Sequence, residues 1–193
     1  MKLVIIDYKG GNVQSVKFAL ERLGVQAKLT ADKEEIESAD KVIFPGEGEA
    51  NSAMRQLKID GLDKLIPTLK QPFLGICLGM QLLCRHSEEN DTPMLNIIPL
   101  EVKHFVTDLK VPHMGWNNIY DLKSPVMQGL ADQDYVYFVH SYFVPISEHT
   151  IAAADYPNPF SAAVQYKNFY AVQFHTEKSG PTGAKILQNF LEL

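Results

Sequence analysis

The first half of the chain alternates between short apolar runs and segments whose apolar residues recur at helical spacing. Buried strands are expected over four apolar runs, at residues 3–7, 25–30, 41–44 and 72–76. Helices are expected over four amphipathic segments, at residues 13–23, 32–38, 50–69 and 78–85. Strands that alternate with helices usually pair in parallel and are covered on both faces. The pattern therefore predicts an α/β fold with a central, mostly parallel sheet and helices on both faces.

The second half is richer in strands. Six are expected at short spacing, over residues 100–105, 117–120, 135–139, 150–155, 162–166 and 170–174, and one helix over residues 183–191. Turn residues between several of them favour antiparallel strands added to the parallel core. No repeat, low-complexity tract or linker interrupts the chain, so residues 1–193 are expected to form a single domain. Ligands of such sheets bind at the carboxyl ends of the strands, which points to the loops after Phe44 and Ile76.

Composition and charge narrow the function classes. Hydrophobic residues make up 46% of the chain, and the formal net charge is -5. Basic residues are scattered, which argues against a nucleic-acid partner. The N-terminal apolar run is too short for a signal peptide, and no stretch approaches the about 20 apolar residues of a membrane span. We therefore expect a cytoplasmic protein with no membrane partner.

Two cysteines, Cys77 and Cys84, are present. On one helix their Cα atoms would be about 10 Å apart, which is too far for the roughly 7 Å limit of a disulfide. A reducing compartment is consistent with this. Without a second close pair of cysteines, a structural zinc site is not expected, and no metal or organic cofactor is indicated.

The strongest local motif is Gly75-Ile76-Cys77-Leu78-Gly79, which follows an apolar strand and opens an amphipathic helix. This is the nucleophile-elbow pattern with cysteine as the nucleophile. The helix N-terminus would lower the pKa of the thiol, and its free N–H groups would bind an oxyanion. The alternative is that Cys77 is a small buried apolar residue. Cys84 lacks this context and is interpreted as structural.

A second motif, His175-Thr176-Glu177, follows an apolar strand. Alternation along a strand would point His175 and Glu177 the same way. His175 would then act as the base for the thiol, and Glu177 would orient the imidazole. Alone, the pair also fits a metal-ligand pair or a surface pair, so its interpretation depends on Cys77.

A third motif, Pro45-Gly46-Glu47-Gly48, ends a strand. Its backbone N–H groups, with that of Leu78, are candidates for an oxyanion hole. The alternative is an ordinary tight turn.

Together these three motifs resemble those of the triad-type glutamine amidotransferases, in order and separation, over essentially the whole chain. The resemblance implies that Cys77 attacks the side-chain amide of glutamine, that a thioester forms, and that ammonia and then glutamate leave. It also implies that Gln81, Glu89, Ser141 and Tyr142 contact the substrate. The alternatives are a solvated helix position for Gln81, a charged loop for Glu89 and a plain strand end for Ser141 and Tyr142.

Further segments are similar to one branch of that family, the glutaminase subunits of imidazole glycerol phosphate synthase. The most discriminating is Val111-Pro112-His113-Met114-Gly115-Trp116-Asn117, and others are residues 6–12, 137–142 and 177–180. The resemblance implies a cyclase partner with a (β/α)8 barrel, which would use the ammonia to make imidazole glycerol phosphate and an aminoimidazole carboxamide ribotide in histidine biosynthesis.

Two residues are candidates for the partner interface. Trp116, expected in a loop, would be an interface anchor or, alternatively, a core aromatic. Lys178 would pair with an acidic residue of the barrel or remain solvated.

The chain departs from the family pattern at two positions. Thr176 stands where the family usually has proline, and Glu47 stands where valine is common. The Glu47 carboxylate is expected to point outward or toward the partner, because a carboxylate facing an oxyanion site would be unfavourable.

Two other function classes compete with the glutaminase. One is another hydrolase of the same fold, such as a cysteine peptidase, which the predicted glutamine contacts argue against. The other is a noncatalytic binding module, which the presence of all three triad residues argues against.

Overall fold

A seven-stranded sheet forms the centre of the computed structural model, which describes all 193 residues. Its strand order is β11-β12-β13-β4-β3-β1-β2. The strands are β1 (Leu3–Ile6), β2 (Lys28–Thr30), β3 (Lys41–Gly46), β4 (Phe73–Cys77), β11 (Thr150–Asp155), β12 (Pro159–Tyr166) and β13 (Phe169–Val172). The five strands from β13 to β2 pair in parallel, and β11 and β12 extend the sheet in antiparallel fashion. The predicted α/β architecture is confirmed.

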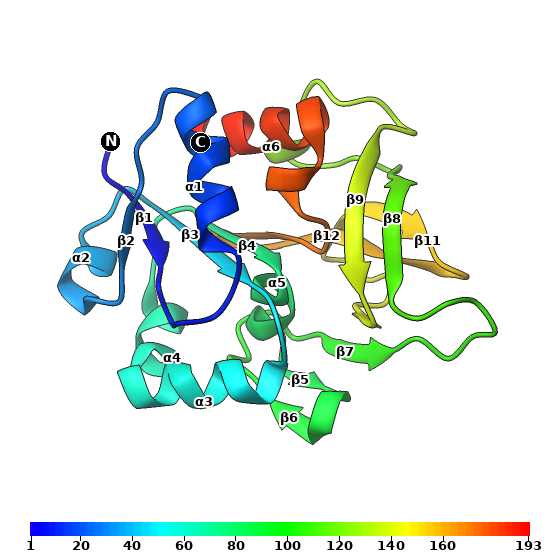
Figure 1. Cartoon of the computed structure of the whole chain (residues 1–193), viewed down its shortest axis with the longest axis horizontal. Coiled ribbons are helices and arrows are strands. Elements are labelled where there is room, and N and C mark those ends of the chain that lie inside the picture. Colours follow the sequence, from blue (N-terminus) through cyan, green and yellow to red (C-terminus); the bar gives the residue numbers. More distant parts are fainter.

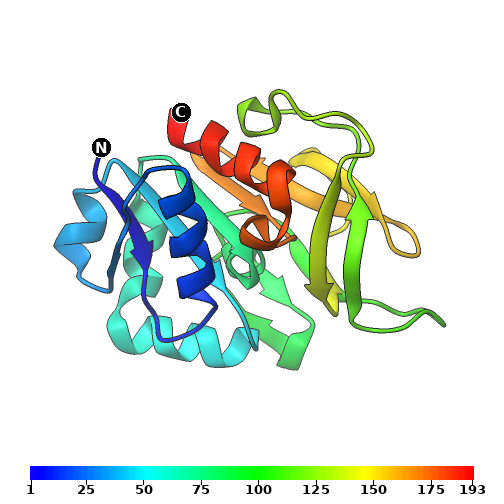
Figure 2. The same ribbon diagram turned by 45° about the horizontal axis from the view of Figure 1, so that its top comes forward.

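Helices cover both faces of this sheet. They are α1 (Val13–Arg22), α2 (Lys33–Glu37), α3 (Ala50–Asp60), α4 (Leu62–Leu65), α5 (Leu78–Leu83) and α6 (Gly180–Glu192), with short 3-10 turns at η1 (Ile66–Thr68), η2 (Glu89–Asp91), η3 (Pro125–Met127) and η4 (Thr176–Lys178). Figures 1 and 2 show α1 and α6 on one face and α3 and α4 on the other. The apolar interior accordingly divides into two clusters of 29 and 27 buried residues.

The central strands are buried along their whole length. Every residue of β1 and β4 is buried, which explains why they occur in the sequence as continuous apolar runs. Strand β9 (Tyr135–His140) instead alternates buried residues with more exposed ones, because only one of its faces packs on the core.

Outside the main sheet, β8 (His113–Asn118) and β9 form an antiparallel pair with His113 opposite His140. Four short strands make a further sheet: β5 (His86–Ser87), β6 (Thr92–Pro93), β7 (Glu101–His104) and β10 (Tyr142–Phe143). The strand predicted over 117–120 was placed too late in the sequence. Gly115, at φ 133, has no side chain to signal a strand, which explains why the start of the strand was missed. Trp116 lies on β8 and not in a loop as expected.

The helix predicted over residues 50–69 is also interrupted. Gly61 adopts the left-handed conformation, with φ 67 and ψ 20, and ends α3 there. A new helix, α4, begins after Gly61 and is followed by the 3-10 turn η1, where Pro67 lies in the first turn. Glycine reaches this conformation without steric cost, which is why the apolar periodicity on either side does not merge into one helix.

No helix of the structure combines the length and the apolar character needed to cross a membrane. Both cysteines are free and buried, as expected from their spacing.

The close packing of α5 on β3 gives a first testable prediction. A Cβ atom built on Gly79 would lie 1.9 Å from the carbonyl oxygen of Phe44. We expect Gly79→Ala to lower the free energy of unfolding by about 3 kcal/mol, because the backbone of two elements must separate. Gly24→Ala is the control: it meets nothing within 4 Å, and its φ of +77 costs about 1 kcal/mol. Urea denaturation measures the free energy of unfolding of both variants. If the two lose equal amounts, the α5–β3 approach is not tight.

Candidate active site

Cys77 lies at the turn between β4 and α5, in a backbone conformation that few residues other than glycine adopt. Its φ is 56 and its ψ is −113. The glycines on either side make this turn possible. A Cβ on Gly75 would lie 2.9 Å from the carbonyl oxygen of Gly79, and Gly79 itself contacts the Phe44 carbonyl. Strain of this kind is held by surrounding structure and is concentrated at functional sites. The elbow inferred from the sequence is thus present in the backbone.

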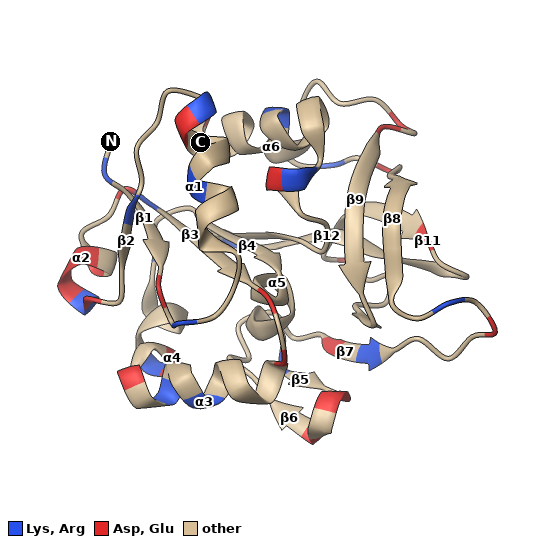
Figure 3. Cartoon of the chain, viewed as in Figure 1, with Lys and Arg blue, Asp and Glu red and all other residues tan.

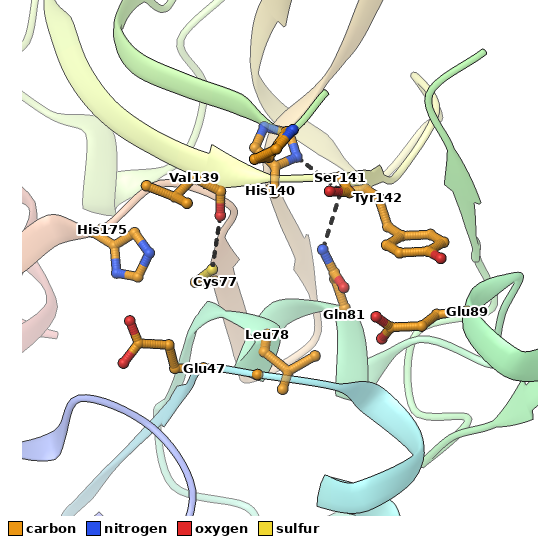
Figure 4. A pocket seen from close by; sticks show the side chains of 12 residues that line it. Glu47, Cys77, Leu78, Gln81, Glu89, Val139, His140, Ser141, Tyr142 and His175 are labelled. Atoms are coloured by element: carbon orange, nitrogen blue, oxygen red, sulfur yellow. Dashed lines mark hydrogen bonds between the residues drawn. The ribbon is translucent and has the colours of Figure 1, made fainter. Parts of the chain in front are cut away.

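The sulfur of Cys77 lies at the bottom of a pocket of about 270 Å³. The residue is 7% exposed, so a small ligand can reach it from one side. Its Sγ lies 3.8 Å from the carbonyl oxygen of Val139 and 3.9 Å from Nε2 of Gln173. Figure 4 shows the sulfur between the β9 wall of the pocket and the His175 ring.

His175 and Glu177 form a buried pair beside this pocket. Nδ1 of His175 lies 2.8 Å from Oε1 of Glu177, and their side chains are 4% and 2% exposed. The His175 backbone is fixed on both sides, because its N–H donates to the Tyr137 carbonyl at 2.9 Å and its carbonyl accepts from Oγ of Ser179 at 2.6 Å. The imidazole is therefore held in one orientation.

The reason given for this pairing from the sequence was wrong, although the two side chains do meet. Strand β13 ends at Val172, and Glu177 lies in the 3-10 helix η4. The carboxylate reaches the ring by the turn of the chain and not by alternation along a strand. Thr176 between them is buried, and no hydrogen-bond partner faces its hydroxyl.

The environment of His175 favours its charged form. Burial lowers the pKa of the ring, but hydrogen bonds with Cys77 and Glu177 outweigh it and raise the pKa to about 10. The imidazole therefore holds its proton through the neutral pH range. A positive ring beside the sulfur stabilises a negative charge there.

The turn after β3 lies next to the nucleophile. Gly46 pairs with Cys77 across the β3–β4 ladder, so Glu47 and Gly48 reach the pocket mouth. Glu47 was expected to point outward or toward the partner. Its side chain is exposed, but Figure 4 places the carboxylate at the pocket entrance on the His175 side. The backbone of this turn and that of Leu78 approach the sulfur from neighbouring elements.

Tyr8 lies against the same turn. A Cβ on Gly46 would be 2.9 Å from its hydroxyl oxygen, so position 46 accepts no side chain. Burial, reinforced by the Cys77 charge, raises the pKa of the Tyr8 phenol. The phenol is therefore neutral, and the charged groups beside the sulfur are those of the triad.

All four predicted substrate contacts line the pocket that contains Cys77: Gln81, Glu89, Ser141 and Tyr142. Nε2 of Gln81 donates to the Tyr142 carbonyl at 3.1 Å and to Oε1 of Gln173 at 2.9 Å, which excludes a solvated helix position for Gln81. The Glu89 carboxylate accepts from the Ala50 N–H at 2.7 Å with one oxygen. Amide, hydroxyl and carboxylate groups thus converge around the nucleophile.

Two contacts of the Cys77 sulfur were not identified from the sequence. Val139 acts through its backbone carbonyl, for which a sequence carries no signal. Gln173 stands in the Gln-Phe-His motif, and its fully buried amide bridges Gln81 and Cys77. A polar residue directly after an apolar strand was the available signal.

The two interface candidates adjoin each other. Trp116 is 56% exposed, which excludes the core interpretation. Its indole lies 3.9 Å from the position of a Cβ on Gly180, two residues after Lys178. Lys178 is partly exposed. Figure 3 shows that β8 and β9 carry no charged side chain.

No three His, Cys, Asp or Glu side chains gather where they could hold a metal ion. The His175–Glu177 pair therefore has no third side chain of this kind with which to bind one.

Comparison with known proteins agrees with this geometry. The model of the family "Glutamine amidotransferase class-I" matches residues 4–193. A protein of Bacteroides thetaiotaomicron named "Imidazole glycerol phosphate synthase subunit HisH" is 56% identical over 196 residues, covering 100% of both chains. A protein of the same name from Vibrio parahaemolyticus is 46% identical over 200 residues, covering 100% of this chain and 98% of its own.

Solved structures show the same fold at low sequence identity. One glutamine amidotransferase structure has a TM-score of 0.77 at 20% identity, covering 98% of this chain and 97% of its own. A glutamine amidotransferase from Thermotoga maritima has a TM-score of 0.65 at 17% identity, covering 100% of this chain and 83% of its own. With a family model that spans nearly all of its residues and full-length relatives at 46–56% identity, the chain belongs to the class-I glutamine amidotransferases.

Proposed function

We propose that this chain, as one domain over residues 1–193, hydrolyses glutamine to glutamate and ammonia. The observation that carries the proposal is the meeting of the thiol, His175 and four polar side chains in one pocket, with Glu177 paired to His175 beside it. Cys77 and His175 are 98 residues apart in the sequence. The names of its full-length relatives support the same activity.

The proposed reaction starts from the ion pair in which His175 already holds the proton of Cys77, and the thiolate attacks the side-chain amide carbon of glutamine. The carbonyl oxygen becomes an oxyanion, for which the N–H groups of Leu78 and of residues 46–48 are the donors. His175 then gives its proton to the leaving nitrogen, and ammonia departs from the thioester. Water, deprotonated by His175, attacks the thioester, and glutamate leaves as the Cys77 thiolate is restored beside the protonated ring. Glu177 orients and stabilises the charged ring throughout.

The relatives are named as subunits of imidazole glycerol phosphate synthase. We propose that this chain likewise passes its ammonia to a cyclase subunit with a (β/α)8 barrel. The cyclase would use it to make imidazole glycerol phosphate and an aminoimidazole carboxamide ribotide for histidine biosynthesis. A cytoplasmic location is proposed, supported by the two free cysteines.

The partner is proposed to dock over the pocket mouth and β8. Trp116 would be its anchor, since it presents a large exposed ring on an uncharged strand beside the triad segment. Aromatic anchors of this kind contribute much of the binding energy of interfaces. Lys178, close to Trp116 in the same region, would pair with an acidic residue of the barrel.

The activity is tested by glutamate release from glutamine, measured for the chain alone and with a cognate cyclase and its nucleotide ligand. We expect strong release in the complex and its loss in Cys77→Ser. Cys84→Ser is the control and should retain the activity, because Cys84 is fully buried in α5's C-terminal end. If the complex forms but no glutamate is released, the glutaminase proposal is wrong and a scaffold role replaces it. Release from peptides and not from glutamine would favour a peptidase.

Replacing the Glu177 carboxylate tests how the base is held. In Glu177→Gln the ring loses a charged partner and its fixed tautomer, so its pKa should fall and kcat should drop by about 10³- to 10⁴-fold. Glu101→Gln, which removes an exposed carboxylate paired with Arg85, is the control and should keep kcat. The pH profile of kcat in both variants is the measurement. An unchanged kcat in Glu177→Gln would exclude an orienting role.

The interface is tested by calorimetric titration with the cyclase. Trp116→Ala should weaken binding by about 30-fold, the effect of removing a strong anchor. Ile59→Ala is the control: Ile59 is 70% exposed but lies on α3, away from β8. Lys178→Met should weaken binding at low salt and less at high salt. Affinity equal to that of Ile59→Ala would rule out Trp116 as an anchor.

A further inference from the structure

Two buried histidines that the proposed reaction does not use form a hydrogen-bonded pair behind the pocket. Nδ1 of His113 lies 2.9 Å from Nε2 of His140. His113 is 4% exposed and His140 is 5% exposed. The pair joins β8 to β9, where the two residues stand opposite each other. His140 also contributes to the pocket lining, and Figure 4 shows it beside Ser141 and Tyr142.

The partners at the two ends of the pair define the direction of its hydrogen bonds. Nδ1 of His140 lies 2.8 Å from the carbonyl oxygen of Tyr142, which only accepts, so this nitrogen carries the hydrogen. In a neutral ring, Nε2 of His140 is then an acceptor. Nδ1 of His113 must therefore donate to it, which leaves Nε2 of His113 as an acceptor.

The amide of Asn117 donates to the other end of the pair, so the hydrogen bonds all run in the same direction. Its Nδ2 lies 3.3 Å from Nε2 of His113 and also donates to the Asp155 carbonyl at 3.0 Å. Its Oδ1 accepts from the Asn118 N–H at 2.9 Å. Because these contacts fix which end of the amide is the donor, one proton arrangement satisfies every group from Asn117 to Tyr142.

The surroundings of the rings favour this neutral arrangement. His113 stacks between Tyr156 and Phe138, with ring centroids 4.0 and 4.9 Å away. Burial lowers the pKa of His113 to about 4, and burial is also the main cause that lowers the pKa of His140 to about 3. Both rings are therefore uncharged at neutral pH. A proton added to His140 would break the bond between the rings, and a proton added to His113 would break its contact with Asn117.

The hydrogen bonds continue from this pair to the nucleophile. The Tyr142 carbonyl that accepts from His140 accepts a second bond from Nε2 of Gln81. Gln81 also donates to Gln173, whose Nε2 lies 3.9 Å from the Cys77 sulfur. The backbone at residues 140–142 is thus fixed at the point where it leaves β9 and enters the pocket wall.

We propose that His113 and His140 are positioning residues for glutamine hydrolysis, which hold the backbone of Ser141 and Tyr142 in the conformation that binds glutamine. This inference rests on the proposed glutaminase function. Neither ring is a catalytic residue, because both nitrogens of each are used in contacts within the protein. The critical group at both positions is an N–H at the place of Nδ1: in His140 it holds the Tyr142 carbonyl, and in His113 it holds His140.

Asparagine and glutamine substitutions separate this role from simple packing. The amide of asparagine places an N–H close to where Nδ1 of histidine lies, whereas glutamine reaches the place of Nε2. Glutamine is the closer match to histidine in length. If the Nδ1 donor matters, His140→Asn and His113→Asn should outperform His140→Gln and His113→Gln. If only volume matters, the order should reverse.

The kinetic test measures KM and kcat for glutamine in the complex with the cyclase and its ligand. We expect each Gln variant to raise KM by about tenfold, the effect of one buried hydrogen bond, with a smaller fall in kcat. Each Asn variant should stay within about threefold of the wild type. Gln variants that match or surpass the Asn variants would overturn the proposal. Thermal unfolding of each variant identifies any that fail to fold.

A second measurement on the wild-type chain does not depend on activity or on any variant being active. In ¹⁵N NMR of histidine-labelled protein at pH 7, two rings should be neutral with the hydrogen on Nδ1, and the His113 and His140 variants should each remove one of them. A charged ring, or a hydrogen on Nε2, at His113 or His140 would overturn the proposal. If this arrangement is found but the wild-type complex releases no glutamate, then the proposed function fails and the buried pair stands as structural.

Discussion

The contact on which the rest of the site depends is the approach of Gly79 to the carbonyl of Phe44. This approach brings the first turn of α5 against β3, and it leaves room for no side chain at position 79. Cys77 is consequently held at a positive φ, above the end of β4. The same packing brings the end of β3 into register with Cys77, so that Gly46 lies opposite it. One close backbone contact thus places the nucleophile and both groups of proposed oxyanion donors.

The two buried cysteines differ in their neighbours. Cys84 has no charged neighbour, and burial raises the pKa of its thiol to about 12, so it remains a small apolar residue of the core. Cys77 lies beside His175, and the Glu177 carboxylate offsets the cost of a buried positive ring. The second buried carboxylate oxygen of Glu177 has no partner, so the His175 contact is the one interaction that compensates its desolvation. The proposed chemistry thus depends on a charged pair that the apolar surroundings alone would destabilise.

The features that could be predicted from the sequence are those encoded locally. Apolar runs gave the central strands, and glycines on both sides of Cys77 gave the elbow. Predictions were wrong where glycine changed the backbone, as at Gly61 and Gly115, and where His175 and Glu177 met through a 3-10 turn. Contacts between distant segments were not predicted: Gln173 meets Gln81 across 92 residues of sequence, and His140 meets His113 across 27. A shift of one residue in the β8–β9 register would turn His113 to the opposite face of the pair.

The need to orient one backbone carbonyl explains why two polar side chains, His113 and His140, lie between β8 and β9 behind the pocket. Apolar packing around Phe138 and Phe160 holds β8 and β9 together, but it is non-directional and does not orient a backbone carbonyl. Beyond His140 the chain leaves the β8–β9 ladder, and the carbonyl of Tyr142 takes its donors from the side chains of His140 and Gln81. Neutral His140 supplies that donor and accepts a hydrogen bond on its other ring nitrogen. His113 and Asn117 then complete the series of hydrogen bonds without an unpaired group. The orientation of the pocket wall is thereby tied to the one pairing of β8 with β9 that places His113 opposite His140.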